Sequence, residues 1–252
     1  MLKKRVIPCL LLHNNSLVKT IKFNQFNYIG DPVNTVRIFN ELEVDEICFL
    51  DIQCSKEKKL ISFDILKKIA NECFMPLSYG GGIDSLEKAQ EIFNIGFEKV
   101  VINSAIYNNS NMVKQIVEIY GSQSVIGSID VKKNLFGKYI VYSHSSSINQ
   151  KKTVIDWVKE VEQMGVGEIL LTNVDNEGTW SGLDEKLITE ISQAISVPLI
   201  AHGGAGNIEH IGKAAHAGAS AICVGSMVVY QKKGMGVLIH FPDKKKIEQA
   251  IK

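Results

Sequence analysis

Short apolar runs rich in valine, isoleucine and leucine recur along the chain, and most of them are separated by segments of helical length and period. The runs lie at 5–11, 46–52, 76–79, 99–103, 124–130, 168–173, 197–201 and 220–225. Such near-continuous apolar runs are typical of strands in a parallel sheet whose faces are both covered. Eight strand–helix units in about 250 residues indicate a closed (β/α)8 barrel, and a doubly wound open sheet is the alternative.

An internal repeat decides between these two architectures. Three pairs of segments match at one constant offset: 45–51 with 167–173, 76–82 with 198–204, and 98–104 with 220–226. Two copies of a four-unit half-barrel explain a constant offset, whereas an open sheet breaks such symmetry at its switch point. We therefore expect residues 1–252 to form one α/β domain, a single (β/α)8 TIM barrel with a twofold half-barrel repeat.

Composition and charge exclude several classes of function. The chain has 28 Lys and Arg against 27 Asp and Glu, which leaves a formal net charge of +1. It therefore lacks the broad positive field of a nucleic-acid binder. The apolar run 6–12 is far shorter than the ~20 residues that a membrane helix needs. Five cysteines without CxxC spacing indicate neither a disulfide framework nor a zinc site. We expect a cytoplasmic protein without nucleic-acid or membrane partners, cofactor or metal.

Glycines gather at the carboxyl ends of the expected strands, the face of a barrel that carries its chemistry. Residues 80–82 and 203–206 occupy equivalent places in the two halves, and 103–104 and 225–226 lie beside them. Backbone N–H groups of such loops, followed by a helix N-terminus, bind anions. One glycine loop is usually only a tight turn, but the paired arrangement predicts two phosphate cradles and a ligand with phosphate at both ends. The candidates are Gly82, Asn103 and Ser104 in the first cradle, and Gly203, Gly204, Gly225 and Ser226 in the second.

Carboxylates stand at the same face, where they act as general acids or bases or remain solvated loop residues. Asp130 ends the run 124–130 and is the predicted catalytic residue, and Asp51 ends the run 46–52. The repeat aligns Asp130 with Leu11, so the second carboxylate of a symmetric site is missing. Further ligand contacts are expected from Thr172, Glu177 and His202.

Charged residues begin four of the expected strands, at the opposite face of the barrel. They are Arg5, Glu46, Lys99 and Glu168. Two cations and two anions around one end of a barrel can close into a salt-bridged ring. In a barrel of unknown function such a ring is expected to seal the core, and a gating role needs independent support.

Motifs spread over nearly the whole chain resemble the cyclase, or synthase, subunit of imidazole glycerol phosphate synthase. They are RVIPCL at 5–10, GDP at 30–32, FLDI at 49–52, GGGI at 80–83, INSA at 102–105, FGK at 136–138, GEILLT at 167–172, GT at 178–179 and GGAGN at 203–207. The resemblance implies a barrel that binds a glutaminase subunit on its N-terminal face and receives ammonia through its axis. It also implies that the four charged residues are an ammonia gate. By the same resemblance, substrate-contacting positions are Lys19, Gly82, Asn103, Asp130, Thr172, Gly203 and Ser226.

Departures from the family pattern cluster at the mouth. Leu11 stands where the family has one of its two acid/base aspartates, Glu177 where it has aspartate, and His202 where it has serine. The segment 14–20 also differs, while the gate and the phosphate loops match. This combination resembles paralogues associated with glycosyl amidation, which work with a glutaminase-like partner and a separate amidotransferase to make acetamidino sugars.

Three hypotheses for function follow. The first is a synthase-type enzyme subunit that takes ammonia from a glutaminase partner and amidates a phosphate-bearing acceptor, a nucleotide sugar of surface polysaccharide biosynthesis. The second is a true cyclase of histidine biosynthesis, a lyase in which Asp130 suffices. The third is a non-catalytic ammonia conduit and scaffold for a separate sugar amidotransferase. None of the five cysteines lies in a glycine-flanked nucleophile turn, so we expect a partner to supply the ammonia.

Overall fold

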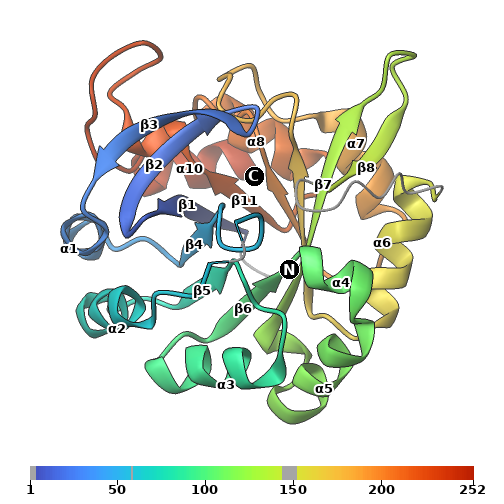
Figure 1. Cartoon of the computed structure of the whole chain (residues 1–252). Coiled ribbons are helices and arrows are strands. Elements are labelled where there is room, and N and C mark those ends of the chain that lie inside the picture. The colour runs from blue at the N-terminus through green and yellow to red at the C-terminus, as the bar shows by residue number, and fades with distance from the viewer. Residues whose placement is uncertain (1–3, 58, 144–151) are drawn as a thin grey trace.

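Eight parallel strands close into a barrel in the computed structural model, which describes residues 4–57, 59–143 and 152–252 (Figure 1). In order around the barrel they are β1 (Arg5–His13), β4 (Ile47–Asp51), β5 (Leu77–Gly80), β6 (Lys99–Ile102), β7 (Val125–Lys133), β9 (Glu168–Asn173), β10 (Leu199–His202) and β11 (Ala221–Val224). Parallel pairing of β11 with β1 closes the sheet. The (β/α)8 barrel predicted from the apolar runs is thereby confirmed.

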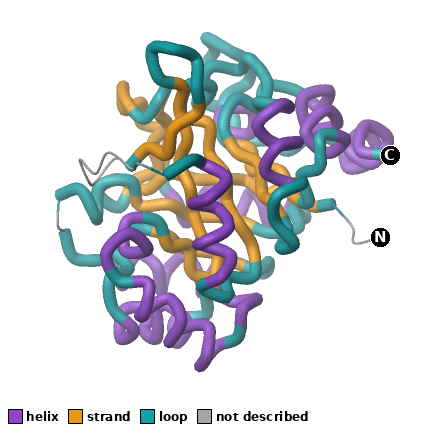
Figure 2. The backbone as a smooth tube through the Cα atoms, turned by 90° about the vertical axis from the view of Figure 1, so that its right-hand side faces the viewer, coloured by secondary structure: helices purple, strands orange, loops and turns teal. Residues whose placement is uncertain are grey.

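Helices surround the barrel, and Figure 2 shows the strands enclosed by them. They are α1 (Pro32–Glu41), α2 (Phe63–Glu72), α3 (Leu86–Ile95), α4 (Ser104–Asn108), α5 (Ser110–Tyr120), α6 (Val154–Gln163), α7 (Glu185–Ser192), α8 (Ile208–His216), α9 (Ser226–Val229) and α10 (Lys244–Ile251), with one 3-10 turn at Ser122–Ser124. Local sequence sets their starts: the Asp31 side chain accepts the N–H of Asn34 at 2.8 Å, and Pro32 opens α1. In the described part of the chain no helix has the length and hydropathy to span a membrane.

Successive side chains of each strand point to opposite faces of the sheet, and this divides the buried apolar residues into two cores. On β1, Val6, Leu10 and Leu12 join a large cluster that includes residues of the surrounding helices. Ile7, Cys9 and Leu11 point the other way, into a cluster built from strands alone. Because the sheet is closed, this second cluster fills the barrel interior. It consists of Ile7, Cys9, Leu11, Val18, Cys48, Val101, Ile126, Leu170, Ile200, Ala221 and Cys223.

Two antiparallel hairpins extend the sheet beyond the barrel on the mouth side (Figure 1). One is formed by β2 (Ser16–Ile21) and β3 (Asn24–Gly30), with β2 paired to β1. The other joins the end of β7 to β8 (Tyr139–Tyr142), and Leu135 and Phe136 lie exposed at its tip. The apolar runs did not predict β3, because it is mostly exposed and lacks a hydrophobic alternation.

The half-barrel repeat appears in the strand register. In the first half, Leu11 pairs with Leu50 and Leu50 with Gly80. In the second half, Asp130 pairs with Thr172 and Thr172 with His202. Leu11 and Asp130 therefore occupy equivalent places. The same row of the sheet is apolar in one half and polar in the other.

Gly81 adopts a backbone conformation that side chains rarely tolerate, with φ of +127°, and a Cβ there would lie 2.5 Å from the carbonyl oxygen of Asp51. We predict that Gly81→Ala lowers the free energy of unfolding by about 1–3 kcal/mol. Gly137→Ala is the matched control, since φ is +73° there and no atom lies within 4 Å of the added carbon. The Gly137→Ala variant should lower the free energy of unfolding, measured with urea, by about 1 kcal/mol or less. Equal losses in the two variants would contradict the close approach at Gly81.

Candidate functional site

The carboxyl ends of the barrel strands open into a cavity of about 1040 Å³, a volume that includes its opening to solvent. Eight of the residues proposed from sequence line it together: Asp51, Gly82, Asn103, Ser104, Asp130, Thr172, Glu177 and His202. A smaller pocket of about 230 Å³ holds the second predicted cradle. Its wall includes Lys19, Glu177, His202, Gly203, Gly204, Gly225 and Ser226.

Among the described residues, only Glu177 and His202 line both pockets, and both side chains are buried. The two cradles therefore belong to neighbouring pockets that share these two side chains. A ligand with phosphate at both ends would lie beside them, and its existence stays a prediction.

Asp130 lies at the floor of the larger cavity, where it is only 7% exposed. The Asn103 amide donates a hydrogen bond of 2.9 Å to its carboxylate. Burial raises the pKa of Asp130 to about 6, although the Asn103 hydrogen bond and the nearby His202 and Thr172 side chains act in the opposite direction. A carboxyl group with this pKa can donate or accept a proton near neutral pH.

Thr172 and His202 continue the polar row that Asp130 begins. The Thr172 Oγ1 and His202 Nδ1 atoms lie 3.2 Å apart, and both side chains are buried. Thr172 pairs with Asp130 of β7 and with His202 of β10 in the strand register, so the three side chains stand in one row across β7, β9 and β10.

Lys19 reaches the second cradle from the β2–β3 hairpin. Its ammonium nitrogen lies 3.5 Å from Glu177 Oε1, and both side chains are almost completely buried. Glu177 also accepts the Phe23 N–H at 3.1 Å through Oε2, so this ion pair holds the hairpin against the barrel. Oε1 has no hydrogen-bond partner among the described residues.

Asp51 has a structural task in addition to lining the cavity. Its Oδ1 accepts the N–H groups of Gln53 at 3.1 Å and Cys54 at 2.9 Å, which shapes the loop after β4. Burial raises the pKa of Asp51, and these two backbone hydrogen bonds partly offset that effect. In the neighbouring loop the N–H of Gly82 donates to the Ser55 hydroxyl at 3.1 Å, so one donor of the first cradle already has a partner.

Sequence reasoning missed several residues that line the cavity. They are Thr20, Phe23 and Phe26 of the β2–β3 hairpin and Gln53, Ser55 and Lys56 of the loop after β4. Thr20 Oγ1 and Gln53 Oε1 are buried without a hydrogen-bond partner among the described residues, so both could contact a polar ligand. No motif marks these positions, and the folds of the hairpin and of the loop after β4 bring them to the mouth.

Three thiols lie inside the barrel below the cavity. Cys9, Cys48 and Cys223 come from β1, β4 and β11, and all five cysteines of the chain are free. The neighbouring thiols lower the pKa of Cys9 and raise the pKa values of Cys48 and Cys223, which burial also raises.

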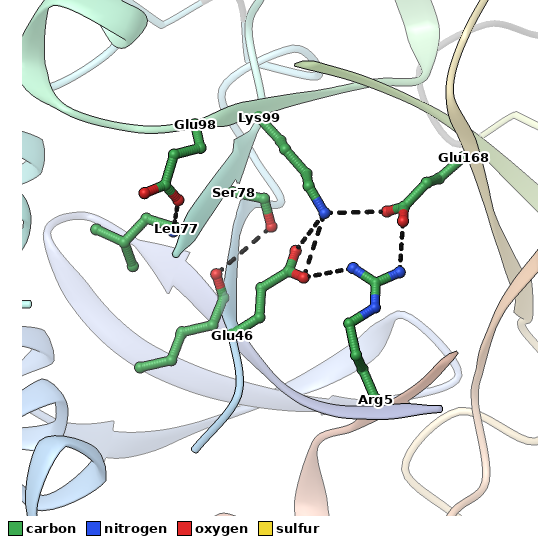
Figure 3. Close-up of polar contacts among 8 residues, drawn as sticks. Arg5, Glu46, Leu77, Ser78, Glu98, Lys99 and Glu168 are labelled. Carbon is green, nitrogen blue, oxygen red and sulfur yellow. Dashed lines mark hydrogen bonds and ion pairs between the residues drawn. The ribbon is translucent and has the colours of Figure 1, made fainter. Parts of the chain in front are cut away.

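The four charged residues at the opposite end form the closed ring expected from their positions at strand starts (Figure 3). Arg5 donates to Glu46 at 2.6 Å and also to Glu168. Lys99 lies 3.2 Å from Glu46 and 3.2 Å from Glu168. Each cation thus contacts both anions. Glu46 is the most buried member, with its side chain 4% exposed.

The similarity of this chain to known proteins extends over all eight strands of the barrel. A family model described as "Histidine biosynthesis protein" matches residues 5–234. The chain belongs to the histidine biosynthesis protein family. Among its relatives in this family, the "Putative imidazole glycerol phosphate synthase subunit hisF2" of Pseudomonas aeruginosa is 43% identical over 249 residues, which cover 98% of this chain and 99% of the relative.

Two further relatives give the same picture. The "Imidazole glycerol phosphate synthase subunit HisF" of Alkaliphilus metalliredigens is 41% identical over 209 residues, 83% of each chain. The "Putative imidazole glycerol phosphate synthase subunit hisF3" of Vibrio vulnificus is 40% identical over 256 residues, which cover 100% of this chain and 97% of the relative. The chain is therefore a HisF-like synthase subunit of the histidine biosynthesis protein family.

The raised pKa of Asp130 generates a pH-dependent prediction for stability. Its pKa is about 6 in the folded protein against 3.8 for an ordinary aspartate, so ionisation destabilises the native state as pH rises from about 4 to 6. We predict that Asp130→Asn raises the free energy of unfolding at pH 8 by about 1–3 kcal/mol and has no such effect at pH 3.5. Urea unfolding at both pH values measures this. Glu248→Gln, on an exposed part of α10, is the control, and a gain at both pH values would contradict the assignment.

Proposed function

We propose that this chain is the synthase-type subunit of a two-component glutamine amidotransferase and amidates a phosphate-bearing acceptor with ammonia from a glutaminase partner. The observation that carries this proposal is the closed ring of Arg5, Glu46, Lys99 and Glu168 at the end of the barrel opposite the cavity. The two features are joined by the barrel interior. Nitrogen that enters at the ring would reach the cavity without leaving the protein.

The barrel interior suits ammonia in its neutral form. Ile7, Val101, Ile126 and Leu170 lie between the ring and the cavity together with the three thiols. Moving a charged ammonium through such surroundings carries a large desolvation cost, while a small neutral molecule avoids it. The ring then acts as the entrance, and the glutaminase partner docks on the face that carries it. The relatives' names, which identify them as subunits of a synthase, support the existence of a partner.

The first cradle is the preferred site for the phosphate of the acceptor. Gly82, Asn103 and Ser104 line the large cavity, and Lys56 adds a positive charge to the same wall. The second cradle lies in the smaller pocket, where the Lys19 ammonium is already paired with the Glu177 carboxylate. We infer that the acceptor places a phosphate in the first cradle and its reacting carbon near Asp130.

Leu11 supports an acceptor other than the cyclase substrate, and we propose a nucleotide sugar of surface polysaccharide biosynthesis. The side chain is 4% exposed and packs among apolar residues at the place equivalent to Asp130. A cyclase that uses two carboxylates would lack one of them here. The cyclase of histidine biosynthesis is the second candidate, which the intact row of Asp130 and its partners favours. In the third, the chain only conducts ammonia to a separate sugar amidotransferase.

The entrance is tested by changing the nitrogen source. Lys99→Ala leaves the two glutamates of the ring with one cation. We expect the rate of glutamine-dependent product formation to fall at least about tenfold, which corresponds to about 1.4 kcal/mol in the activation barrier. Free ammonium should still support the reaction. Product formation is measured in the complex with each nitrogen source. Lys213→Ala, which removes an exposed ion pair with Glu209 on α8, is the matched control. Equal losses with glutamine and ammonium would indicate a purely structural ring.

The missing carboxylate generates a second test, made with the phosphoribosyl substrate of imidazole glycerol phosphate synthase and ammonium. We expect weak turnover by the unmodified chain and an increase in Leu11→Asp, since a positioned acid or base contributes about 10²–10⁴-fold. Because Leu11 is buried, this variant should lose about 1–3 kcal/mol of stability. Leu11→Asn, similar in size but unable to transfer a proton, is the control. Efficient turnover by the unmodified chain would favour the histidine biosynthesis candidate instead.

A further inference from the structure

One wall of the large cavity carries side chains that neither the proton chemistry of Asp130 nor the path of ammonia uses. The β2–β3 hairpin and the loop after β4 form this part of the lining, which we call the hairpin wall. Its residues are Thr20, Phe23, Phe26, Gln53, Ser55 and Lys56. They supply aromatic rings, hydrogen-bond acceptors and a positive charge, and each of these features recognises a different part of a ligand.

Phe26 presents an aromatic ring to the cavity. Its ring stacks on the imidazole of His13, with centroids 5.1 Å apart and an angle of 21° between the two planes. Phe26 lines the cavity and His13 does not, and Phe26 remains 45% exposed. Single exposed apolar residues are common on protein surfaces. A ring held by a stacking partner at the edge of a cavity is different, because it can receive a second planar group.

The other aromatic ring of the hairpin wall is less accessible. Phe23 is half-buried, and its ring lies 6.4 Å from the ring of Tyr142 on β8. The backbone N–H of Phe23 donates to Glu177, which fixes the turn of the hairpin against the barrel. Phe23 therefore anchors the hairpin, and Phe26 is the ring that is open to a ligand.

Two oxygen atoms of the hairpin wall lack a hydrogen-bond donor. They are Thr20 Oγ1 and Gln53 Oε1, which have no partner among the described residues. Thr20 is 2% exposed and Gln53 is 6% exposed, so bulk water does not replace the missing donors. A buried acceptor without a donor carries a free-energy cost, and a ligand removes that cost by supplying a hydroxyl or N–H group.

The charged groups of this region favour phosphate at one place and hydrogen-bond donors at another. Lys56 lines the cavity together with the first cradle, and no ion pair of the described residues includes it, since the neighbouring Lys59 pairs with Glu57. Asp51 lies beside Gln53, whose N–H donates to the Asp51 carboxylate at 3.1 Å. The carboxylate repels phosphate but accepts hydroxyl groups. Phosphate is therefore expected at Lys56 and the first cradle, and hydroxyl groups at Asp51 and Gln53.

We propose that the hairpin wall binds the nucleoside of a nucleoside diphosphate, with its base stacked on Phe26. A nucleoside diphosphate combines a planar base, hydroxyl and N–H donors, and phosphates, which match the ring, the two acceptor oxygens and Lys56. This assignment rests on the proposed function and gives the nucleotide of the acceptor its place in the cavity. Asn103 of the first cradle donates to Asp130 at 2.9 Å, so a sugar joined to the phosphates would lie near that carboxyl group.

Binding of ligands that cannot react tests the nucleoside site. Isothermal titration calorimetry of the full chain with UDP, ADP and inorganic pyrophosphate compares two linked phosphates with and without a nucleoside. We expect at least one nucleotide to bind about 5- to 100-fold more tightly than pyrophosphate, since stacking of one base on an aromatic ring supplies a factor of this size. If neither nucleotide bound more tightly than pyrophosphate, or if none of the three bound, the proposal would be overturned.

Substitution of Phe26 tests the stacking itself. Phe26→Leu keeps an apolar side chain without a π-face, so nucleotide affinity should fall about 5- to 100-fold. Pyrophosphate affinity should stay unchanged, which also shows that the variant is folded. Phe26→Tyr keeps the ring and should keep the affinity. Phe136→Leu, at the exposed tip of the β7–β8 hairpin and outside the cavity, is the matched control. Unchanged nucleotide affinity in Phe26→Leu would overturn the stacking.

The acceptor oxygen of Gln53 gives an independent measurement. Gln53→Met has a similar length but no carbonyl, and it should lower nucleotide affinity about 2- to 10-fold at constant pyrophosphate affinity. An unchanged value would remove Gln53 from the nucleoside site. These outcomes are separate from those of the proposed function. Nucleotide binding that depends on Phe26, in a chain that forms no amidated product, would refute amidation and retain the nucleoside site. Amidation of a nucleotide sugar with the same KM in Phe26→Leu would do the reverse.

Discussion

Closure of the parallel sheet between β1 and β11 is the constraint on which the rest of this structure depends. A closed sheet has no free edge, and all its strands point the same way, so every strand begins at one end and finishes at the other. Charged residues at strand starts are therefore gathered into a ring, and polar residues at strand ends are gathered around a cavity. The length of the barrel separates the charged ring from the polar residues of the cavity.

The two halves of the barrel share a backbone plan but differ in chemistry. Register pairs Leu11 with Leu50 in one half and Asp130 with Thr172 in the other. In this row, one side of the mouth therefore presents apolar side chains, while the other presents a carboxyl, a hydroxyl and an imidazole group. The side chains of His202 and Glu177 line the pockets of both cradles. A ligand that fits this mouth has an orientation imposed on it, since the two sides are not interchangeable.

Much of this arrangement could be predicted from sequence because it depends on local pattern. Apolar runs locate the barrel strands, the repeat locates equivalent positions, and residues at strand ends follow from both. The β2–β3 hairpin could not be located in this way, because β3 is exposed and has no apolar alternation. Lys19 and Glu177 are far apart in sequence, and only the folding of that hairpin over the mouth pairs them. The orphaned oxygens of Thr20 and Gln53 likewise depend on loop conformation and have no motif.

The β7–β8 hairpin has a mechanical consequence for the mouth. β7 runs without interruption from Val125 in the barrel wall to Lys133 in the hairpin, and Asp130 pairs with Thr172 on one side and with Tyr142 on the other. Asp130 thus lies at the junction where the wall becomes a two-stranded arm. The exposed tip at Leu135 and Phe136 and the peptide that carries the carboxylate thus belong to one continuous ladder. A change in the twist of the hairpin would therefore reach the backbone of Asp130 before it reached any other strand of the barrel.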